Sequence, residues 1–120
     1  MRNGMTKLTE RESGRVIIEA LTIARTPLQR MRGLLGRNGL PANEGMFIER
    51  CSSIHTFFMR FPLDVIFLDR DLRVNRVIRH LKPWRLAGSW GAAHVIEAEA
   101  GSLEHFDLAE GLALALEDGS

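Results

Sequence analysis

The chain has 120 residues, a length that fits one domain, and 45% of them are hydrophobic, which is enough for a packed core. Its formal net charge of +1 gives no general attraction to nucleic acid or to a membrane surface. A single cysteine excludes an intrachain disulfide, and no apolar stretch approaches the roughly 18 residues of a membrane-spanning helix. The amino terminus lacks the apolar region of a signal peptide, so we expect a cytoplasmic protein without nucleic-acid partners.

Most of the chain has the alternating pattern of short β-strands. Residues 1–14 are polar and without period, and we expect a flexible tail there, followed by a single domain over residues 15–118. Alternation and β-branched residues predict strands over 16–24, 45–49, 54–59, 63–69, 74–80, 94–100 and 112–117. The polar residues 69–71 predict a hairpin turn between two of these strands.

Two short helices are expected between the strands. Thr26, Pro27 and Gln29 have the pattern of a capped helix N-terminus, and the segment is expected to run over about residues 27–36. Ser102 can cap a second short helix through Phe106. Six or seven strands with two short helices predict a mainly β barrel or sandwich.

Five short motifs follow one another along the chain: Arg30-x-x-Gly33-Leu34, Gly45-Met46, His55 to Met59, Leu63-Asp64-x-x-Phe67-x-Asp69, and Glu97-x-x-Ala100-Gly101. Their order and spacing resemble the signature of the domain-of-unknown-function 192 family, over about residues 15–118. The resemblance implies a compact β-rich domain and brings no established activity, cofactor or catalytic residue. Phe58 stands where many relatives have Trp, and residues 60–62 replace a more polar segment. A ligand that contacts these residues would therefore differ from the ligand of those relatives.

Cys51 and His55 are the pair that most resembles a nucleophile with its base. In one extended strand, four residues at about 3.3 Å rise separate them by about 13 Å, whereas such a pair needs roughly 3 Å. The pair therefore fails unless a turn or bulge at Ser52-Ser53 folds the chain back, and Cys51 is otherwise structural. Because the other histidines are scattered, the sequence predicts no metal site and no cofactor.

Two carboxylates lie on predicted strands. Asp64 has apolar neighbours, so it needs a partner, which Arg30, His55 or backbone N–H groups could provide. Asp64 is then either a structural ion pair or cap, or a polar anchor in a pocket. Glu97 lies beside small residues and is ordinarily solvated or paired across strands. A paired acid and base formed by Asp64 and Glu97 would require the carboxyl groups to approach within about 5–10 Å.

Residues 81–93 contain Trp84, Arg85 and Trp90 and are expected to form a long loop. Trp and Arg are favoured at binding hot spots, so this loop offers a recognition surface, although both Trp side chains could also cover one end of the barrel.

Together these features predict a non-catalytic binding domain for an unidentified small molecule or peptide. The predicted ligand-binding residues are His55, Met59, Asp64, Trp84, Arg85 and Glu97. One alternative is a small hydrolase that uses His55 with Asp64 or Glu97, which requires the side chains to meet in one cleft. A second alternative is an interaction module that docks a protein through the Trp84–Trp90 loop and presents an apolar patch.

Overall fold

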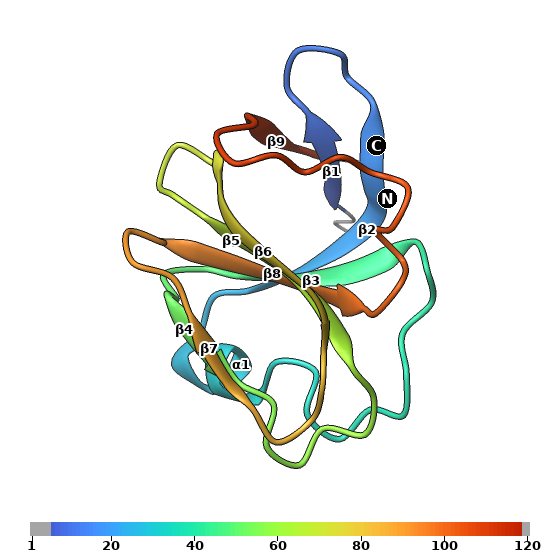
Figure 1. Ribbon diagram of the computed structural model, residues 1–120, viewed down its shortest axis with the longest axis vertical. Helices are drawn as coiled ribbons and strands as arrows, with labels where there is room; N and C mark the ends of the chain where they lie inside the picture. Colours follow the sequence, from blue (N-terminus) through green and yellow to red (C-terminus); the bar gives the residue numbers. More distant parts are fainter. Residues whose placement is uncertain (1–5, 119–120) are drawn as a thin grey trace.

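The computed structural model describes residues 6–118, with the side chains of residues 31 and 32 excepted (Figure 1). The elements in chain order are β1 (Thr6–Glu10), β2 (Val16–Ala24), α1 (Pro27–Arg32), β3 (Glu44–Ile48), β4 (Ser53–His55), β5 (Leu63–Leu68), β6 (Val74–Leu81), β7 (Leu86–Gly88), β8 (His94–Glu99) and β9 (Leu114–Asp118). Seven strands form one sheet in the order β6-β5-β8-β3-β2-β1-β9, and β4 pairs with β7 in a separate two-stranded ribbon. The prediction of a mainly β, sandwich-like domain is confirmed.

The segment Thr6–Glu10 is part of the sheet. β1 pairs antiparallel with β2 on one side and with β9 on the other, and Leu8 is fully buried. The prediction of a flexible tail over residues 1–14 is therefore wrong for this segment, because pairing with two strands orders a stretch that has only one large apolar residue. Residues 1–5 lie outside the described part of the chain.

The helix α1 begins as the sequence predicts. The Thr26 hydroxyl accepts the Gln29 backbone N–H at 3.1 Å, and the Gln29 side chain accepts the Thr26 backbone N–H at 3.1 Å. This reciprocal pair is a capping box. The helix ends earlier than predicted, at Gly33, whose φ of +50° lies in the left-handed region that favours glycine.

The prediction of a second helix over residues 102–106 is wrong. The segment forms consecutive turns, in which Glu104 N–H donates to the Gly101 carbonyl and Phe106 N–H donates to the Leu103 carbonyl. These bonds join residues three apart and do not continue into a helix. No helix in the described residues is long and apolar enough to cross a membrane.

The connection from β2 to β3 places α1 over one face of the sheet. β2 and β3 are parallel neighbours, so the chain between them must cross over a face of the sheet instead of turning back. Figure 1 shows α1 together with β4 and β7 on one side of the central strands. Next to β3, the approach of β8 is close: a Cβ atom at Gly45 would lie 3.0 Å from the Glu97 carbonyl oxygen.

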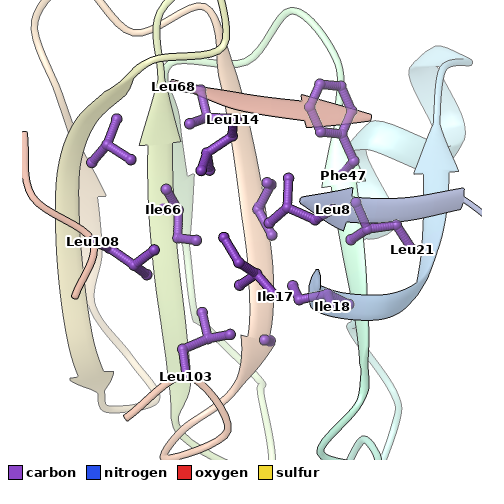
Figure 2. Close-up of a cluster of buried hydrophobic side chains, with 13 residues drawn as sticks. Leu8, Ile17, Ile18, Leu21, Phe47, Ile66, Leu68, Leu103, Leu108 and Leu114 are labelled. Carbon is purple, nitrogen blue, oxygen red and sulfur yellow. The ribbon is translucent and has the colours of Figure 1, made fainter. Parts of the chain in front are cut away.

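The strand β5, which lies between β6 and β8, is buried along its whole length because both faces of the sheet are covered there. Ile66 and Leu68 point into an apolar cluster with Leu8 and other residues of β1, β2 and β9 (Figure 2). Val65 and Phe67 point into a second cluster on the face that α1 and the β4–β7 ribbon cover. The alternation predicted for this strand is therefore confirmed.

The two edges of the large sheet meet only at one corner. Arg73 forms an isolated antiparallel bridge with Ala113, and Val74 N–H donates to the Leu112 carbonyl at 2.8 Å. The sheet curls strongly but does not close into a barrel.

Thr56 joins the β4–β7 ribbon to the preceding loop. Its buried hydroxyl donates to the Lys82 carbonyl at 2.7 Å and accepts the Arg85 N–H at 2.8 Å. Its carbonyl accepts the Trp84 N–H at 2.9 Å. The prediction of a structureless loop over residues 81–93 is therefore wrong at β7, because pairing with β4 and the Thr56 bonds order this segment.

Replacing Thr56 with Val keeps the shape of the side chain but leaves the Lys82 carbonyl and the Arg85 N–H without their partner. We expect Thr56→Val to lower the free energy of unfolding by about 2 kcal/mol in urea denaturation. Thr22→Val on an exposed position of β2 is the matched control and should change stability by less than about 0.5 kcal/mol. Equal effects of the two substitutions would contradict the role assigned to the hydroxyl.

Candidate functional site

The two buried carboxylates of the chain, Asp64 and Glu97, point to opposite faces of the sheet. In the β5–β8 pair, Val65 lies opposite Glu97 and Asp64 lies opposite Ala98. Residues directly opposed on neighbouring strands share a face, and successive residues alternate between faces. Asp64 and Glu97 therefore cannot form an acid–base pair, and a hydrolase that uses Asp64 together with Glu97 is excluded.

The carboxylate of Asp64 is satisfied by three backbone N–H groups. Oδ1 accepts from His80 at 3.0 Å, and Oδ2 accepts from Gly101 at 3.0 Å and from Leu103 at 3.3 Å. These donors belong to the end of β6 and to the turn after β8, and His80 is held there at a φ of +57°. The contacts support the structural account of Asp64, with backbone groups as its partners instead of an arginine or histidine side chain.

Asp64→Asn should destabilise the fold, because an amide nitrogen cannot accept the N–H groups that the carboxylate oxygen accepts. We expect a loss of about 2–3 kcal/mol in the free energy of unfolding, measured with urea. Asp107→Asn, at an exposed position, is the matched control and should be nearly neutral. A loss for Asp64→Asn as small as the control's would show that the three backbone bonds contribute little.

A cavity of about 180 Å³ lies on the other face, between α1, β4 and the sheet, and we call it the Glu97 cavity. Its polar lining comes from Arg30, Cys51, Ser53, His55 and Glu97. Apolar side chains, Met59 among them, form the remaining walls. Three of the six predicted site residues, His55, Met59 and Glu97, therefore meet at one place, whereas Asp64, Trp84 and Arg85 are not part of its lining.

Glu97 is buried at this cavity, and none of the side chains that the structure describes is its partner. Its side chain is 5% exposed, and no described group donates a hydrogen bond to its carboxyl or forms an ion pair with it. Burial raises the pKa of Glu97 to about 7. Two residues further along the same strand face, Glu99 accepts the Leu40 N–H at 2.6 Å. The expectation that Glu97 is solvated or paired across strands is therefore wrong.

Gly33 lets Glu97 lie close to the end of α1. A Cβ atom at Gly33 would be 3.3 Å from Oε1 of Glu97. Any larger residue would press on the carboxyl and narrow the cavity, and the φ of +50° also favours glycine here. The motif Arg30-x-x-Gly33 thus contributes two lining residues that sequence reasoning did not assign to the site, and the glycine in the motif was the available signal.

Cys51 and His55 line the same cavity because the chain bends at Ser52 before β4 begins. The Cys51 thiol donates to the Ser53 carbonyl at 3.0 Å and not to His55. Burial raises the pKa of the Cys51 thiol, and the charge of Glu97 acts in the same direction. The thiol is therefore protonated at neutral pH and lacks the activation that a nucleophilic cysteine needs.

An exposed aromatic patch adjoins the cavity through His55. The patch consists of Phe57, Phe58, Trp84 and Leu86, and the last three side chains are 68%, 56% and 74% exposed. Phe57 packs against His55 at 5.1 Å between ring centroids and stacks on Trp84 at 5.9 Å. The ring centroids of Phe58 and Trp84 are 4.6 Å apart, and both residues have positive φ angles, of 66° and 65°.

The other predicted residues of the Trp84–Trp90 loop are not part of the lining of the Glu97 cavity. The Arg85 guanidinium group donates at 3.4 Å to the carbonyls of Pro83 and Trp84, so it stays close to its own loop. Trp90 is fully exposed. Within residues 6–118, no three His, Cys, Asp or Glu side chains gather in the arrangement of a metal site.

The fold and the cavity together define a small β-rich domain with one buried carboxyl at an open site. The family model of DUF192, described as "Uncharacterized ACR", matches residues 7–116. The chain therefore belongs to the DUF192 family, as the motifs indicate.

Two related sequences bear the name UPF0127. A UPF0127 protein of Thermococcus sibiricus is 30% identical over 109 residues, which cover 83% of this chain and 68% of that protein. A UPF0127 protein of Pyrococcus horikoshii is 46% identical over 54 residues, which cover 44% of this chain and only 46% of that protein.

Two solved structures share the fold. One is a protein from Sinorhizobium meliloti 1021 whose description proposes a transcription regulator, with a TM-score of 0.79, 23% identity and coverage of 93% of this chain and 92% of that one. The other is a protein of unknown function from Novosphingobium aromaticivorans, with a TM-score of 0.78, 24% identity and coverage of 92% and 83%. At these identities the likeness shows the fold alone.

Proposed function

We propose that the protein is a non-catalytic binding domain and that the Glu97 cavity holds a small molecule or one side chain of a peptide. The observation that carries this proposal is the Glu97 carboxyl, which is buried at an open cavity and accepts no hydrogen bond from the described residues. A buried polar group without a hydrogen-bond partner costs about 1–3 kcal/mol. A ligand that donates to Glu97 would remove this cost, and this gain favours binding.

The lining of the cavity suits a small ligand. Binding sites are mostly apolar and carry a few polar groups that orient the ligand. Here Met59 and its apolar neighbours provide the apolar walls, while His55 and Glu97 provide the polar groups that could orient a ligand. A volume of about 180 Å³ is below the 300 Å³ or so where pockets for drug-sized molecules begin, so the bound group is small.

The aromatic patch extends the proposed site beyond the cavity. Trp84 and Phe58 are exposed next to His55, so a peptide with one side chain in the cavity could pack its neighbouring residues on them. In this proposal Trp84 supplies apolar contact, Arg85 lies at the outer edge, and Asp64 holds the fold. A purely protein-docking module remains the version of this proposal in which the patch alone binds.

A hydrolase that uses His55 with Glu97 is the second candidate, and one observation favours it: both residues line the same cavity. A carboxyl with a pKa raised to about 7 is also suited to proton transfer near neutral pH. Against this candidate, the Cys51 thiol is not activated and Asp64 faces the other layer. No nucleophile is therefore prepared at the cavity among the described residues.

Retention of small molecules tests the proposal. The purified protein is incubated with the low-molecular-weight fraction of a bacterial extract, unbound compounds are removed, and retained compounds are released and identified by mass spectrometry. We expect at least one compound to be retained by the wild type and by Glu99→Gln, which keeps its acceptor for the Leu40 N–H, and lost from Glu97→Gln. No retention above that of heat-unfolded protein, or equal retention by Glu97→Gln, would contradict the proposal. A compound recovered only as its hydrolysed product would favour the hydrolase.

A further inference from the structure

Resting on the binding role proposed above, we propose that the Glu97 cavity takes a cationic nitrogen group, such as an ammonium or guanidinium group, carried on a short apolar stem. The Glu97 carboxylate pairs with the charge, and the apolar walls of the cavity surround the stem. The proposal thus specifies the class of ligand that this site would bind.

The first feature is that no cationic side chain in the described part of the chain pairs with Glu97. Arg30 lines the cavity, but its guanidinium group donates to the Arg25 carbonyl at 2.9 Å, and no ion pair joins it to Glu97. Arg25 itself forms an ion pair with Glu49 at 3.5 Å. An ionised carboxylate in a low-dielectric site is strongly disfavoured unless a cation pairs with it. Because the described side chains supply no such cation, a cationic ligand would stabilise the ionised form of Glu97 by binding there.

The second feature is the contrast between Glu97 and Glu99. Both side chains lie on the same face of β8, and Glu99 is satisfied by the Leu40 N–H at 2.6 Å. The segment after α1 thus supplies a backbone donor for Glu99. Next to Glu97 the same segment has Gly33, whose N–H already donates to the Gln29 carbonyl. The open side of Glu97 is the cavity, and among the described side chains none donates to it there, so a ligand could supply the missing donor.

The third feature is the shape and lining of the cavity. Leu34, Ile54 and Met59 offer apolar surface next to the carboxyl, which matches a methylene stem that ends in a charged nitrogen. About 180 Å³ corresponds to about six water molecules at liquid volume, enough for a butylammonium group. An anionic group would place like charges together at Glu97, and a neutral alcohol would gain no charge pairing.

This pairing makes binding dependent on pH. The charged or titratable groups that line the cavity with Glu97 are Arg30 from α1, Cys51 from the segment after β3 and His55 from β4. A cation binds the ionised carboxylate, and burial raises the pKa of Glu97 to about 7. The affinity should therefore rise about tenfold from about pH 6 to about pH 8, while an alkylamine stays protonated throughout.

The test uses n-butylamine as the probe, with 1-butanol and butyrate as neutral and anionic probes of the same length. Binding is followed by amide chemical-shift changes in two-dimensional NMR spectra. We expect butylamine to shift the amides of residues 95–99 saturably and more tightly at higher pH. The affinity should fall about tenfold or more in Glu97→Gln and stay unchanged in Glu99→Gln. His55→Gln should retain the pH dependence, which separates the role of Glu97 from that of His55.

The outcomes separate this inference from the proposed function. Butanol or butyrate binding in the cavity as tightly as butylamine would overturn the cationic ligand class and leave a binding site in place. Butylamine affinity that is independent of pH, or equal in Glu97→Gln, would overturn the pairing with Glu97. No saturable shift with any probe would also overturn it, and the retention experiment then decides the proposed function separately. If Glu97→Gln does not fold, the pH dependence of the wild type and of His55→Gln still decides the inference.

Discussion

The pairing register between β5 and β8 controls both buried carboxylates of the domain. Because Val65 lies opposite Glu97, Asp64 points into one apolar layer and Glu97 into the other. A slip of one residue in either strand would turn the side chains of that strand to the opposite face and place its carboxyl in the wrong surroundings. The register is in turn supported by Asp64 itself, whose bonds to Gly101 and Leu103 tie β5 to the turn that follows β8.

The two carboxyls differ because of what covers each face. On the face of Asp64, irregular backbone at the end of β6 and after β8 presents three N–H groups to the oxygens, and the charge is accommodated. On the face of Glu97, the crossover from β2 to β3 brings α1 and a glycine against the strand, none of the described groups there is a donor, and a cavity is left. One fold therefore uses one acid for its structure, and the second acid is the one that we propose to meet a ligand.

The sequence predicts the local features well. Alternation predicts the bounds of β2, β5 and β8 to within one residue. The capping pattern predicts the start of α1, and the order of the motifs indicates the family. The failures are at places that depend on distant partners. β1 is ordered by β9, more than one hundred residues away along the chain, as the bond from Thr9 to Glu117 shows. The burial of Glu97 depends on α1 crossing the sheet, and a strand pattern cannot reveal which face a crossover covers.

The most direct test of this account is an NMR titration of the Glu97 side-chain carboxyl carbon in the wild-type protein without added ligand. The signal is assigned by its absence in Glu97→Gln. We predict a midpoint near pH 7, because the carboxyl is buried and no group in the described part of the chain donates to it or pairs with it. A midpoint near 4.5, the ordinary value of a glutamate, would show that the carboxyl is solvated or already paired, and the proposed site would be contradicted.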